Sequence, residues 1–229
     1  MVKSIAIVGG SSDIAKSTIS SMSADNYKFH VLVRDDSHTD ELSASGVSVV
    51  LGDATSEEDI KNFISGVKES GEIHAILHCV GSFAVRPPHA MNKEAFETVI
   101  STNLTSAFLT LSIAGKAMLS QGHGRMVFMS SVAGSLGLVN HEAISAAKGG
   151  IESMVRSAAA TYANRGLRIN AVAPGLTDTK LASPIMSNET ASQAASQKIP
   201  IKRVGQKEEV ANVIKWLLTE APENFTGQI

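Results

Sequence analysis

The sequence has a single cysteine, Cys79, among its 229 residues. One thiol cannot close an intrachain disulfide or build a thiolate metal cage, and this usage fits the reducing cytoplasm. The chain also lacks an excess of charge of either sign, because 20 basic and 22 acidic residues leave a formal net charge of −2. Such a balance gives no electrostatic footprint for nucleic acid or for an anionic membrane surface. We therefore expect a cytoplasmic protein that binds neither.

Long apolar runs are missing as well. No uninterrupted apolar segment approaches the roughly 18 residues of a membrane-spanning helix, and the apolar run near the N-terminus is too short for a signal peptide. The histidines do not have metal-ligand spacing, so we expect no metal. The chain does have ample material for a core, with 43% hydrophobic residues. This composition and length predict one globular domain.

Short β-branched runs recur along the chain, with helix-length segments between them. This alternation predicts βαβ units and a parallel sheet, and continuously apolar runs are typical of strands covered on both faces. We therefore predict a single-domain α/β fold, a Rossmann-like doubly wound parallel sheet with helices on both faces. The expected strands are residues 4–8, 29–33, 47–51, 73–80, 125–129 and 167–172, and the expected helices are residues 14–22, 57–68, 93–119, 142–163 and 208–218.

Residues 183–198 differ from the rest of the chain in composition. They are rich in Ser, Ala, Asn and Gln and contain few large apolar residues. Two interpretations are equally open: a mobile flap over a substrate site, or a solvated helical excursion with no such role. No repeat or linker divides the chain into further domains.

A glycine-containing turn, VGGSSDIA at residues 8–15, follows the first predicted strand and precedes a helix. Glycines allow a tight turn and the close approach of a pyrophosphate, which the amides and dipole of the helix N-terminus stabilise. The motif is weak alone. Its position at the start of a βαβ unit favours a dinucleotide site over a turn without a ligand.

Several further segments resemble the short-chain dehydrogenase/reductase family, whose first turn reads TGxxxGxG. GDAT at residues 52–55 resembles its adenine-contacting segment, HCVG at 78–81 stands where the family has NNAG, and NAVAPG at 170–175 matches the segment beside the nicotinamide. The resemblance covers nearly the whole chain and implies a nicotinamide cofactor and a small-molecule substrate. The cofactor-binding residues that it implies are Gly9, Ser11, Ser12, Asp13, Ile14, Arg34, Asp53, Ala54, Cys79, Val80, Gly81, Lys148, Pro174, Gly175 and Thr177.

Two positions in the turn depart from the family, because Asp13 and Ala15 replace glycines. Alanine is a small change. A carboxylate at Asp13, however, would weaken pyrophosphate binding by charge repulsion unless it points to solvent as a helix-start residue.

The end of the second predicted strand bears on the choice of cofactor. An acidic residue there accepts the ribose hydroxyls of NAD, whereas an arginine pairs with the 2′-phosphate of NADP. The family's acidic position is Val33 in this chain, and Arg34 follows it. This favours NADP. NAD stays possible, because Arg34 could instead pair with Asp35 or Asp36.

The resemblance also implies an active site of Asn, Ser, Tyr and Lys, with Ser thirteen residues before Tyr and Tyr four before Lys. Asn103, Ser131 and Lys148 match three of these positions, but the fourth is Ile144. In the family the tyrosine gives a proton to the oxyanion left by hydride transfer, which isoleucine cannot do. The two tyrosines of the chain, Tyr27 before the second strand and Tyr162 near a helix end, are too distant to replace it.

A replacement proton donor has to project from the same helix face. His141 lies three positions before Ile144, about 60° away on a helix, and histidine titrates near neutral pH. Lys148 could also donate a proton directly, in addition to its family role of binding the nicotinamide ribose. The alternative is a plain helix start with Asn140 as its cap and no role for His141.

Two functions remain open. The first is an NAD(P)-dependent oxidoreductase acting on a small carbonyl or alcohol, with His141 or Lys148 in place of the tyrosine. The second is an NADP-binding protein without turnover, which uses the cofactor as a structural or sensing ligand. A scaffold without ligand is disfavoured, because cofactor residues persist in several segments. The family's long helices pair across subunits, so the resemblance implies a homodimer or homotetramer.

Overall fold

The computed structural model describes residues 3–22 and 26–229. Its main sheet has six parallel strands in the order β3-β2-β1-β4-β5-β6. The chain forms β1 in the middle of the sheet, adds β2 and β3 on one side of it, and then adds β4, β5 and β6 on the other side. The direction in which strands are added therefore changes between β1 and β4, which makes this position a topological switch point. The predicted fold class is confirmed. The strands are β1 Lys3–Val8, β2 Tyr27–Val33, β3 Ser48–Leu51, β4 Ile73–His78, β5 Gly124–Met129 and β6 Leu167–Val172.

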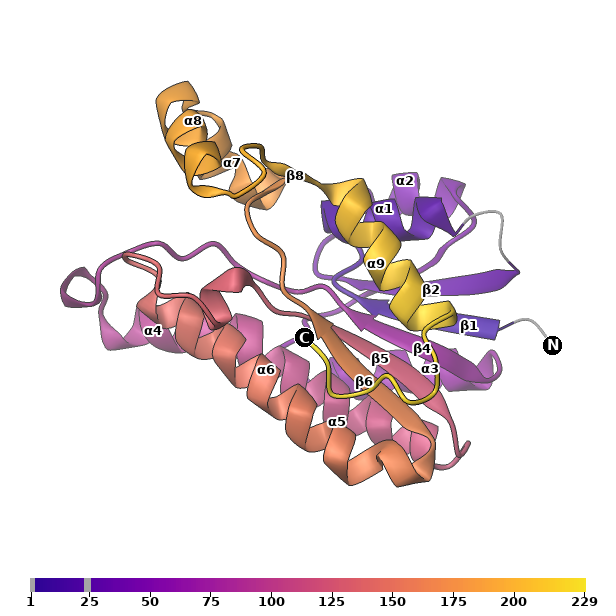
Figure 1. The fold of residues 1–229 in the computed structure, drawn as a ribbon. Coiled ribbons are helices and arrows are strands. Elements are labelled where there is room, and N and C mark those ends of the chain that lie inside the picture. The colour runs from indigo at the N-terminus through magenta and orange to yellow at the C-terminus, as the bar shows by residue number, and fades with distance from the viewer. Residues whose placement is uncertain (1–2, 23–25) are drawn as a thin grey trace.

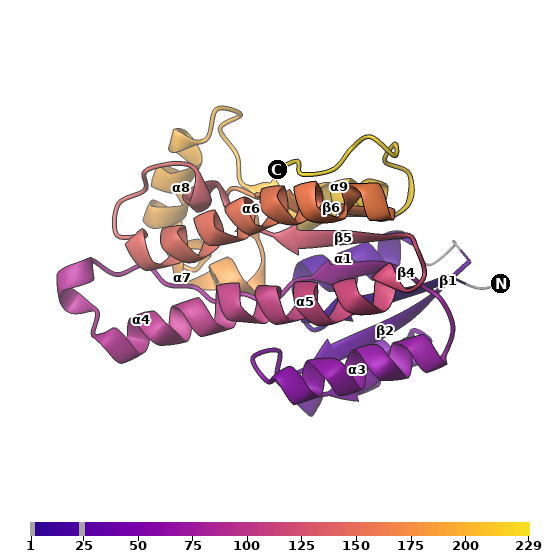
Figure 2. The same ribbon diagram turned by 90° about the horizontal axis from the view of Figure 1, so that it is seen from below.

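Helices cover both faces of this sheet (Figures 1 and 2). Helices α1 (Asp13–Ser21) and α9 (Lys207–Thr219) lie on one face, and α3 (Glu57–Glu69), α5 (Ser106–Leu119) and α6 (Glu142–Tyr162) lie on the other. Because successive strand residues point to opposite faces, the central strands contribute side chains to two separate cores. In β1, Ala6 and Val8 join the core under α3, α5 and α6, whereas Ile5 and Ile7 join the core under α1 and α9.

The helix predicted over residues 93–119 is continuous but not uniform. It consists of α4 (Lys93–Ile100) and α5, joined by a π-helical turn at Ser101–Thr105. By length and composition this segment is also a candidate membrane span, with 44% of its apolar window buried inside the protein. It packs against α3 and α6, as the core helix of a layered fold does.

Three other features differ from the sequence-based expectation. Strand β2 begins at Tyr27 instead of residue 29, so this tyrosine belongs to the strand. Strand β4 ends at His78, which leaves Cys79 and Val80 in the following loop. A short helix, α2 (Thr39–Ala44), was not predicted, because six residues are too few to show a helical period.

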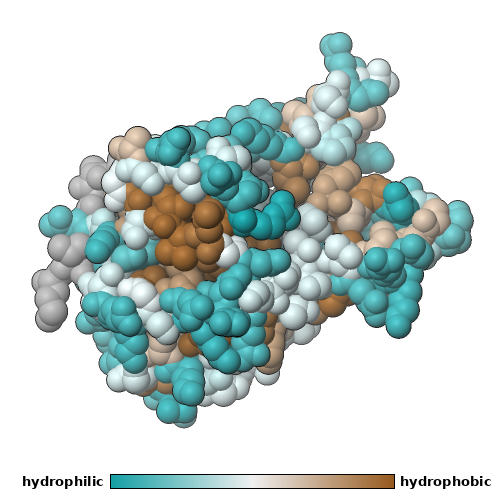
Figure 3. Space-filling model, turned by 180° about the vertical axis from the view of Figure 1, so that it is seen from behind, coloured by the Kyte–Doolittle hydropathy of each residue, from teal (hydrophilic) through white to brown (hydrophobic). Residues whose placement is uncertain are grey.

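Residues 183–198 form two helices that project from the layered body (Figure 1). Helices α7 (Ser183–Met186) and α8 (Glu189–Lys198) lie between strands β7 (Thr177–Asp178) and β8 (Gly205–Gln206), which pair in parallel and close the base of this arm. No residue of α8 is buried. The view from behind shows a notch between the arm and the lobe that carries α4, with apolar surface on its walls (Figure 3).

Candidate functional site

The glycine turn lies at the carboxyl end of β1, and its two glycines are required by close contacts. Gly9 has a φ of +87°, and a Cβ there would lie 2.9 Å from the backbone nitrogen of Val80. A Cβ on Gly10 would lie 2.5 Å from that of Val31. Ser12 then caps α1, its hydroxyl accepting a hydrogen bond from Ala15 N at 3.1 Å. The turn therefore places the N-terminus of α1 at the carboxyl end of β1, where the backbone amides of the helix can bind an anion.

Asp13 occupies the first position of α1, and its carboxylate is engaged far along the chain. Its Oδ2 accepts a hydrogen bond from the backbone nitrogen of Lys180 at 2.6 Å. Lys180 lies at the base of the projecting arm, two residues after the end of β7. The carboxylate thus ties the glycine turn to the arm, a role that the sequence did not indicate. Its negative charge stays at the helix N-terminus.

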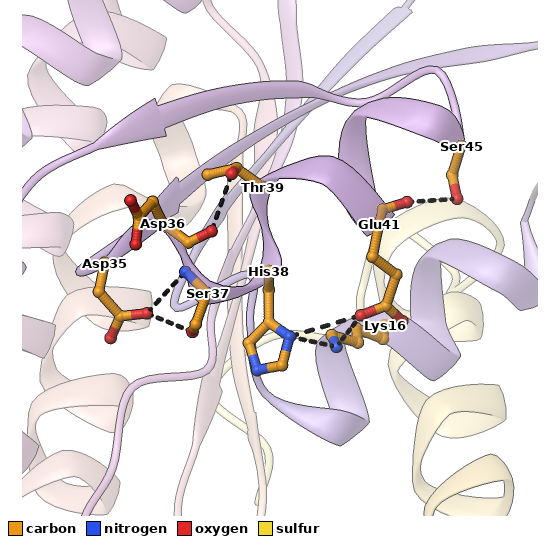
Figure 4. Close-up of polar contacts among 8 residues, drawn as sticks. All are labelled: Lys16, Asp35, Asp36, Ser37, His38, Thr39, Glu41 and Ser45. Atoms are coloured by element: carbon orange, nitrogen blue, oxygen red, sulfur yellow. Dashed lines mark hydrogen bonds and ion pairs between the residues drawn. The ribbon is translucent and has the colours of Figure 1, made fainter.

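Arg34 follows β2 as expected, and its side chain is exposed. Within residues 3–22 and 26–229 it forms no ion pair, so the expected alternative of pairing with Asp35 or Asp36 is not realised. Asp35 instead accepts hydrogen bonds from the backbone and hydroxyl of Ser37 (Figure 4). These bonds, with a smaller contribution from the Arg34 charge, lower the pKa of Asp35. The guanidinium is free to meet a phosphate.

A second basic group stands beside Arg34's loop and was missed at the sequence level. Lys16 reaches from α1 to Glu41 Oε2 at 2.6 Å and to His38 Nδ1 at 3.1 Å (Figure 4). The hydrogen bond from Lys16 is the main cause of the lowered pKa of Glu41. The unpredicted helix α2 brings these three residues together, so their spacing in the sequence gave no indication of the cluster.

Asp53 and Cys79 follow β3 and β4. The Asp53 carboxylate accepts hydrogen bonds from the backbone and hydroxyl of Thr55, both at 2.8 Å, and so shapes the start of α3 with Ala54 between them. Cys79 N donates to Val8 O at 2.8 Å, which holds this loop beside the glycine turn. Burial raises the pKa of the Cys79 thiol to about 12, so the group stays protonated and has no thiolate chemistry.

Asn103, Gly81 and Lys148 meet at the carboxyl end of β4. Asn103 is fully buried in the π-helical turn, where its amide donates to Ser82 Oγ at 2.8 Å and to Val99 O at 2.9 Å. A Cβ on Gly81 would lie 3.4 Å from Asn103 Oδ1 and 3.6 Å from Lys148 Nζ. Isolated π-helical turns are frequent at functional sites, and this one aims Asn103 into the space beside Gly81.

Lys148 is buried on α6, with 6% of its surface exposed. Its Nζ donates a hydrogen bond to Met129 O, the last residue of β5, at 2.8 Å. Burial lowers the pKa of this ammonium group to about 8. A lysine with such a pKa is mostly protonated at neutral pH and can lose its proton at little free-energy cost.

Ser131 lies just beyond β5 and caps a short 3-10 turn, Val132–Gly134. Its Oγ accepts a hydrogen bond from Ala133 N at 3.2 Å, which leaves the hydroxyl proton available to a ligand. The neighbouring Val132 N donates to Pro174 O at 3.0 Å, so this loop is joined to the segment after β6. Thr177 is buried there and donates to Gly175 O at 3.1 Å.

Two expectations at the start of α6 are wrong. His141, not Asn140, occupies the N-cap position and makes no side-chain capping bond, and Asn140 has a positive φ of 63°. His141 therefore lies outside the helix, and the 100° per residue used to place it near Ile144 does not apply. Its Nδ1 donates to Val139 O at 2.7 Å. Ile144 is 7% exposed and packs in an apolar cluster with Val99 and Ala133.

The residues expected to hold a dinucleotide therefore lie on the side of the sheet where the parallel strands have their carboxyl ends. The turn at Gly9, the N-terminus of α1, the exposed Arg34 and the space between Gly81 and Lys148 are the features there that could hold a dinucleotide. Ser11 and Ile14 belong to the same turn and helix start. A separate pocket of about 280 Å³, lined by Met91, Phe96 and Ala143, contains none of them.

Comparison with known proteins decides the family. The model for the family described as Enoyl-(Acyl carrier protein) reductase matches residues 9–229. The 3-oxoacyl-acyl-carrier-protein reductase MabA of Mycobacterium tuberculosis is 32% identical over 228 residues, which cover 99% of this chain and 90% of MabA. The chain belongs to the short-chain dehydrogenase/reductase family. The expected enzyme class, an NAD(P)-dependent oxidoreductase, is confirmed by these relatives.

Solved structures share the fold. A short-chain type dehydrogenase/reductase from Mycobacterium ulcerans superimposes with a TM-score of 0.93 at 24% identity, over 99% of this chain and 86% of that one. The structure of ElxO with NADP bound gives a TM-score of 0.92 at 25% identity and covers 100% of this chain and 96% of ElxO. The expected cofactor, NADP, is thus the one bound by this neighbour.

Proposed function

We propose that this short-chain oxidoreductase uses NADP to interconvert a small carbonyl compound and its alcohol. The observation that carries the proposal is the convergence of Asn103, Gly81 and Lys148 beside the glycine turn. MabA's name describes the reduction of a 3-oxoacyl group, which belongs to the same carbonyl class. When bound, the nicotinamide supplies or accepts the hydride.

Each part of the cofactor has a proposed partner in the chain. The N-terminus of α1 binds the pyrophosphate, and Arg34 pairs with the 2′-phosphate. Lys148 Nζ, which faces Gly81, binds the nicotinamide ribose. Asn103 fixes the Gly81–Ser82 loop through Ser82 and so keeps this cradle in shape.

The substrate carbonyl requires a hydrogen-bond donor and a proton. Ser131 donates its hydroxyl proton as a hydrogen bond to the carbonyl oxygen. The proton that completes the alcohol comes from Lys148 or from His141, because Ile144 stands where the family has its tyrosine. Lys148 is favoured by its burial and its lowered pKa of about 8, whereas His141 Nδ1 is already engaged by Val139.

Two substitutions distinguish these donors. If His141 gives the proton, His141→Ala abolishes NADPH oxidation and leaves NADP affinity nearly unchanged, because the imidazole is not needed to hold the ribose. If Lys148 gives it, His141→Ala keeps activity, and Lys148→Met loses both turnover and affinity. Steady-state rates with a panel of carbonyl compounds, and calorimetry with NADP, measure the two quantities.

The second candidate function is NADP binding without turnover. It is favoured by the apolar cluster around Ile144, the residue that we align with the family's tyrosine. The same panel separates the two functions. Binding of NADPH with no oxidation by any carbonyl compound, and no reduction of NADP by any alcohol, would support the second and contradict the first.

The proposal extends to the setting of the enzyme. We place it in the cytoplasm, as a homodimer or homotetramer joined through the long helices. This is supported by the single cysteine and by the exposed rings of Phe96 on α4 and Phe108 on α5. We further propose that the α7–α8 arm is the mobile substrate flap. Light scattering measures the number of subunits in the assembly, and a monomer at micromolar concentration would contradict the proposed homodimer or homotetramer.

A further inference from the structure

Glu152 is a buried carboxylate one helical turn after Lys148, on the same face of α6. Only 3% of its surface is exposed. Its Oε1 accepts a hydrogen bond from Ser130 Oγ at 3.0 Å, and its Oε2 accepts one from Ser135 Oγ at 2.9 Å. Arg156 Nη2 approaches Oε2 at 3.3 Å. A buried carboxylate needs such donors, because desolvation without them is strongly unfavourable.

The two serines enclose Ser131 and the 3-10 turn that it caps. On the opposite side, backbone bonds join this segment to the loop after β6: Ser130 N donates to Val172 O at 2.7 Å, and Val132 N to Pro174 O at 3.0 Å. On the helix side, Ser130 Oγ also approaches Lys148 O at 3.3 Å, so Glu152 supplies the shorter bonds of a two-sided attachment. It joins the segment that carries Ser131 to the helix that carries Lys148.

Close packing shows how tightly this segment lies on α6. A Cβ on Gly134 would lie 2.8 Å from Glu152 Oε1 and 3.1 Å from Gly149 N. No side chain fits between the turn and the helix. The contact between the carboxylate and the turn is thus direct.

We propose that Glu152 is a positioning residue, which holds the Ser131 hydroxyl at the place where it meets the substrate carbonyl. The inference rests on the proposed function for the role of Ser131, but not for the attachment itself. Without the carboxylate, Ser135 Oγ loses its acceptor on α6, and Ser130 Oγ is left with the longer bond to Lys148 O at 3.3 Å, so the attachment of the turn to the helix is weakened. The hydrogen bond from the Ser131 hydroxyl to the substrate carbonyl then becomes misaligned. Lys148, the proposed ribose-binding residue, keeps its bond to Met129 O.

Kinetics test the role. We expect Glu152→Ala to lower kcat about 10- to 100-fold and to leave NADP affinity within about twofold. In a Ser131→Ala background the same change should lower kcat less than twofold, because the hydroxyl that Glu152 positions is already gone. Glu152→Gln, which keeps one acceptor oxygen, should recover part of the rate. Equal losses of kcat in the two backgrounds would overturn the proposal.

Amide hydrogen exchange tests the attachment without any need for turnover. We expect exchange in the peptide covering residues 130–135 to rise at least tenfold in Glu152→Ala and by less in Ser135→Ala, while the peptides of β1 and β4 keep their rates. Glu69→Ala, which removes an exposed carboxylate from α3, is the matched control. Unchanged exchange in residues 130–135 would overturn the proposal. An inactive wild-type enzyme with raised exchange in the variant would contradict the proposed function alone.

Discussion

Among single residues, Lys148 combines burial with a positive charge. Its pKa is about 8 in the folded protein against a usual 10.5, because burial disfavours the ammonium form. Between these values the unfolded chain carries a proton that the folded protein has lost. The free energy of unfolding therefore increases as the pH is raised from about 8 to about 10.5. This group contributes up to about 3 kcal/mol to that increase, and its destabilising effect is largest below pH 8.

The matched variant is Lys148→Met, which keeps the length and removes the titration. Urea unfolding at pH 8 and pH 10 should show the wild type gaining stability relative to this variant as the pH increases. A constant difference between the two proteins would show that the lysine is solvated and titrates normally.

Ile144 offers a test of the proposal that this chain lacks the family's proton-donating tyrosine. Because it is packed against Val99 and Ala133, both Ile144→Tyr and Ile144→Phe overfill the cluster and should destabilise the protein by about 1–3 kcal/mol. Only the tyrosine brings a hydroxyl near Lys148. We expect NADPH oxidation by Ile144→Tyr to exceed that by Ile144→Phe at least tenfold. Equal rates would mean that the phenol does not reach the carbonyl.

The residues of the site were predictable to different degrees. Asn103 and Lys148 lie far apart in sequence, yet both approach Gly81 after β4, and Ser131 follows the neighbouring strand β5. That the three form one active site stays a prediction. The cap of α6 was predicted wrongly, because Asn is a preferred N-cap residue, whereas Asn140 has a positive φ of 63° and the helix begins only at Glu142. The bond from Lys180 to Asp13 spans 167 residues and leaves no local signal.

Among the helices and strands, the link between α1 and the projecting arm is the feature most open to testing. Asp13→Asn keeps an acceptor for Lys180 N but removes a negative charge from the helix end where the pyrophosphate is proposed to bind. We expect NADP to bind about two- to fivefold more tightly, with a difference that shrinks as salt increases. Calorimetry at low and high salt measures this, and an unchanged affinity would show that the carboxylate does not face the cofactor.

The same elements show where pattern reasoning ends. Strands β1, β4, β5 and β6 were found within a few residues, because buried parallel strands are continuous apolar runs bounded by turns. The π-helical turn at Ser101–Thr105 was invisible, since one extra residue in a turn leaves the apolar spacing of a 27-residue segment almost unchanged. Helix α2 was missed because it is short and mostly exposed.

For the whole molecule, we expect NADP to stabilise the folded state. A ligand that binds only the folded state raises the free energy of unfolding by about 2.7 kcal/mol at 100 times its Kd.

Arg34→Ala removes the proposed partner of the 2′-phosphate, so NADP affinity should fall tenfold or more while NAD affinity stays nearly constant. Thermal shift with both cofactors measures the preference. Equal or tighter binding of NAD by the wild type would contradict it.

The central claim is hydride transfer, and the most direct measurement follows the hydride itself. NADPH carrying deuterium at the transferred position is incubated with the protein and with a carbonyl compound that it reduces, and the alcohol is analysed by mass spectrometry. The account predicts one deuterium atom on the former carbonyl carbon, in the wild type and, at a lower rate, in Ser131→Ala. An alcohol without deuterium, or no alcohol from any carbonyl compound, would contradict it.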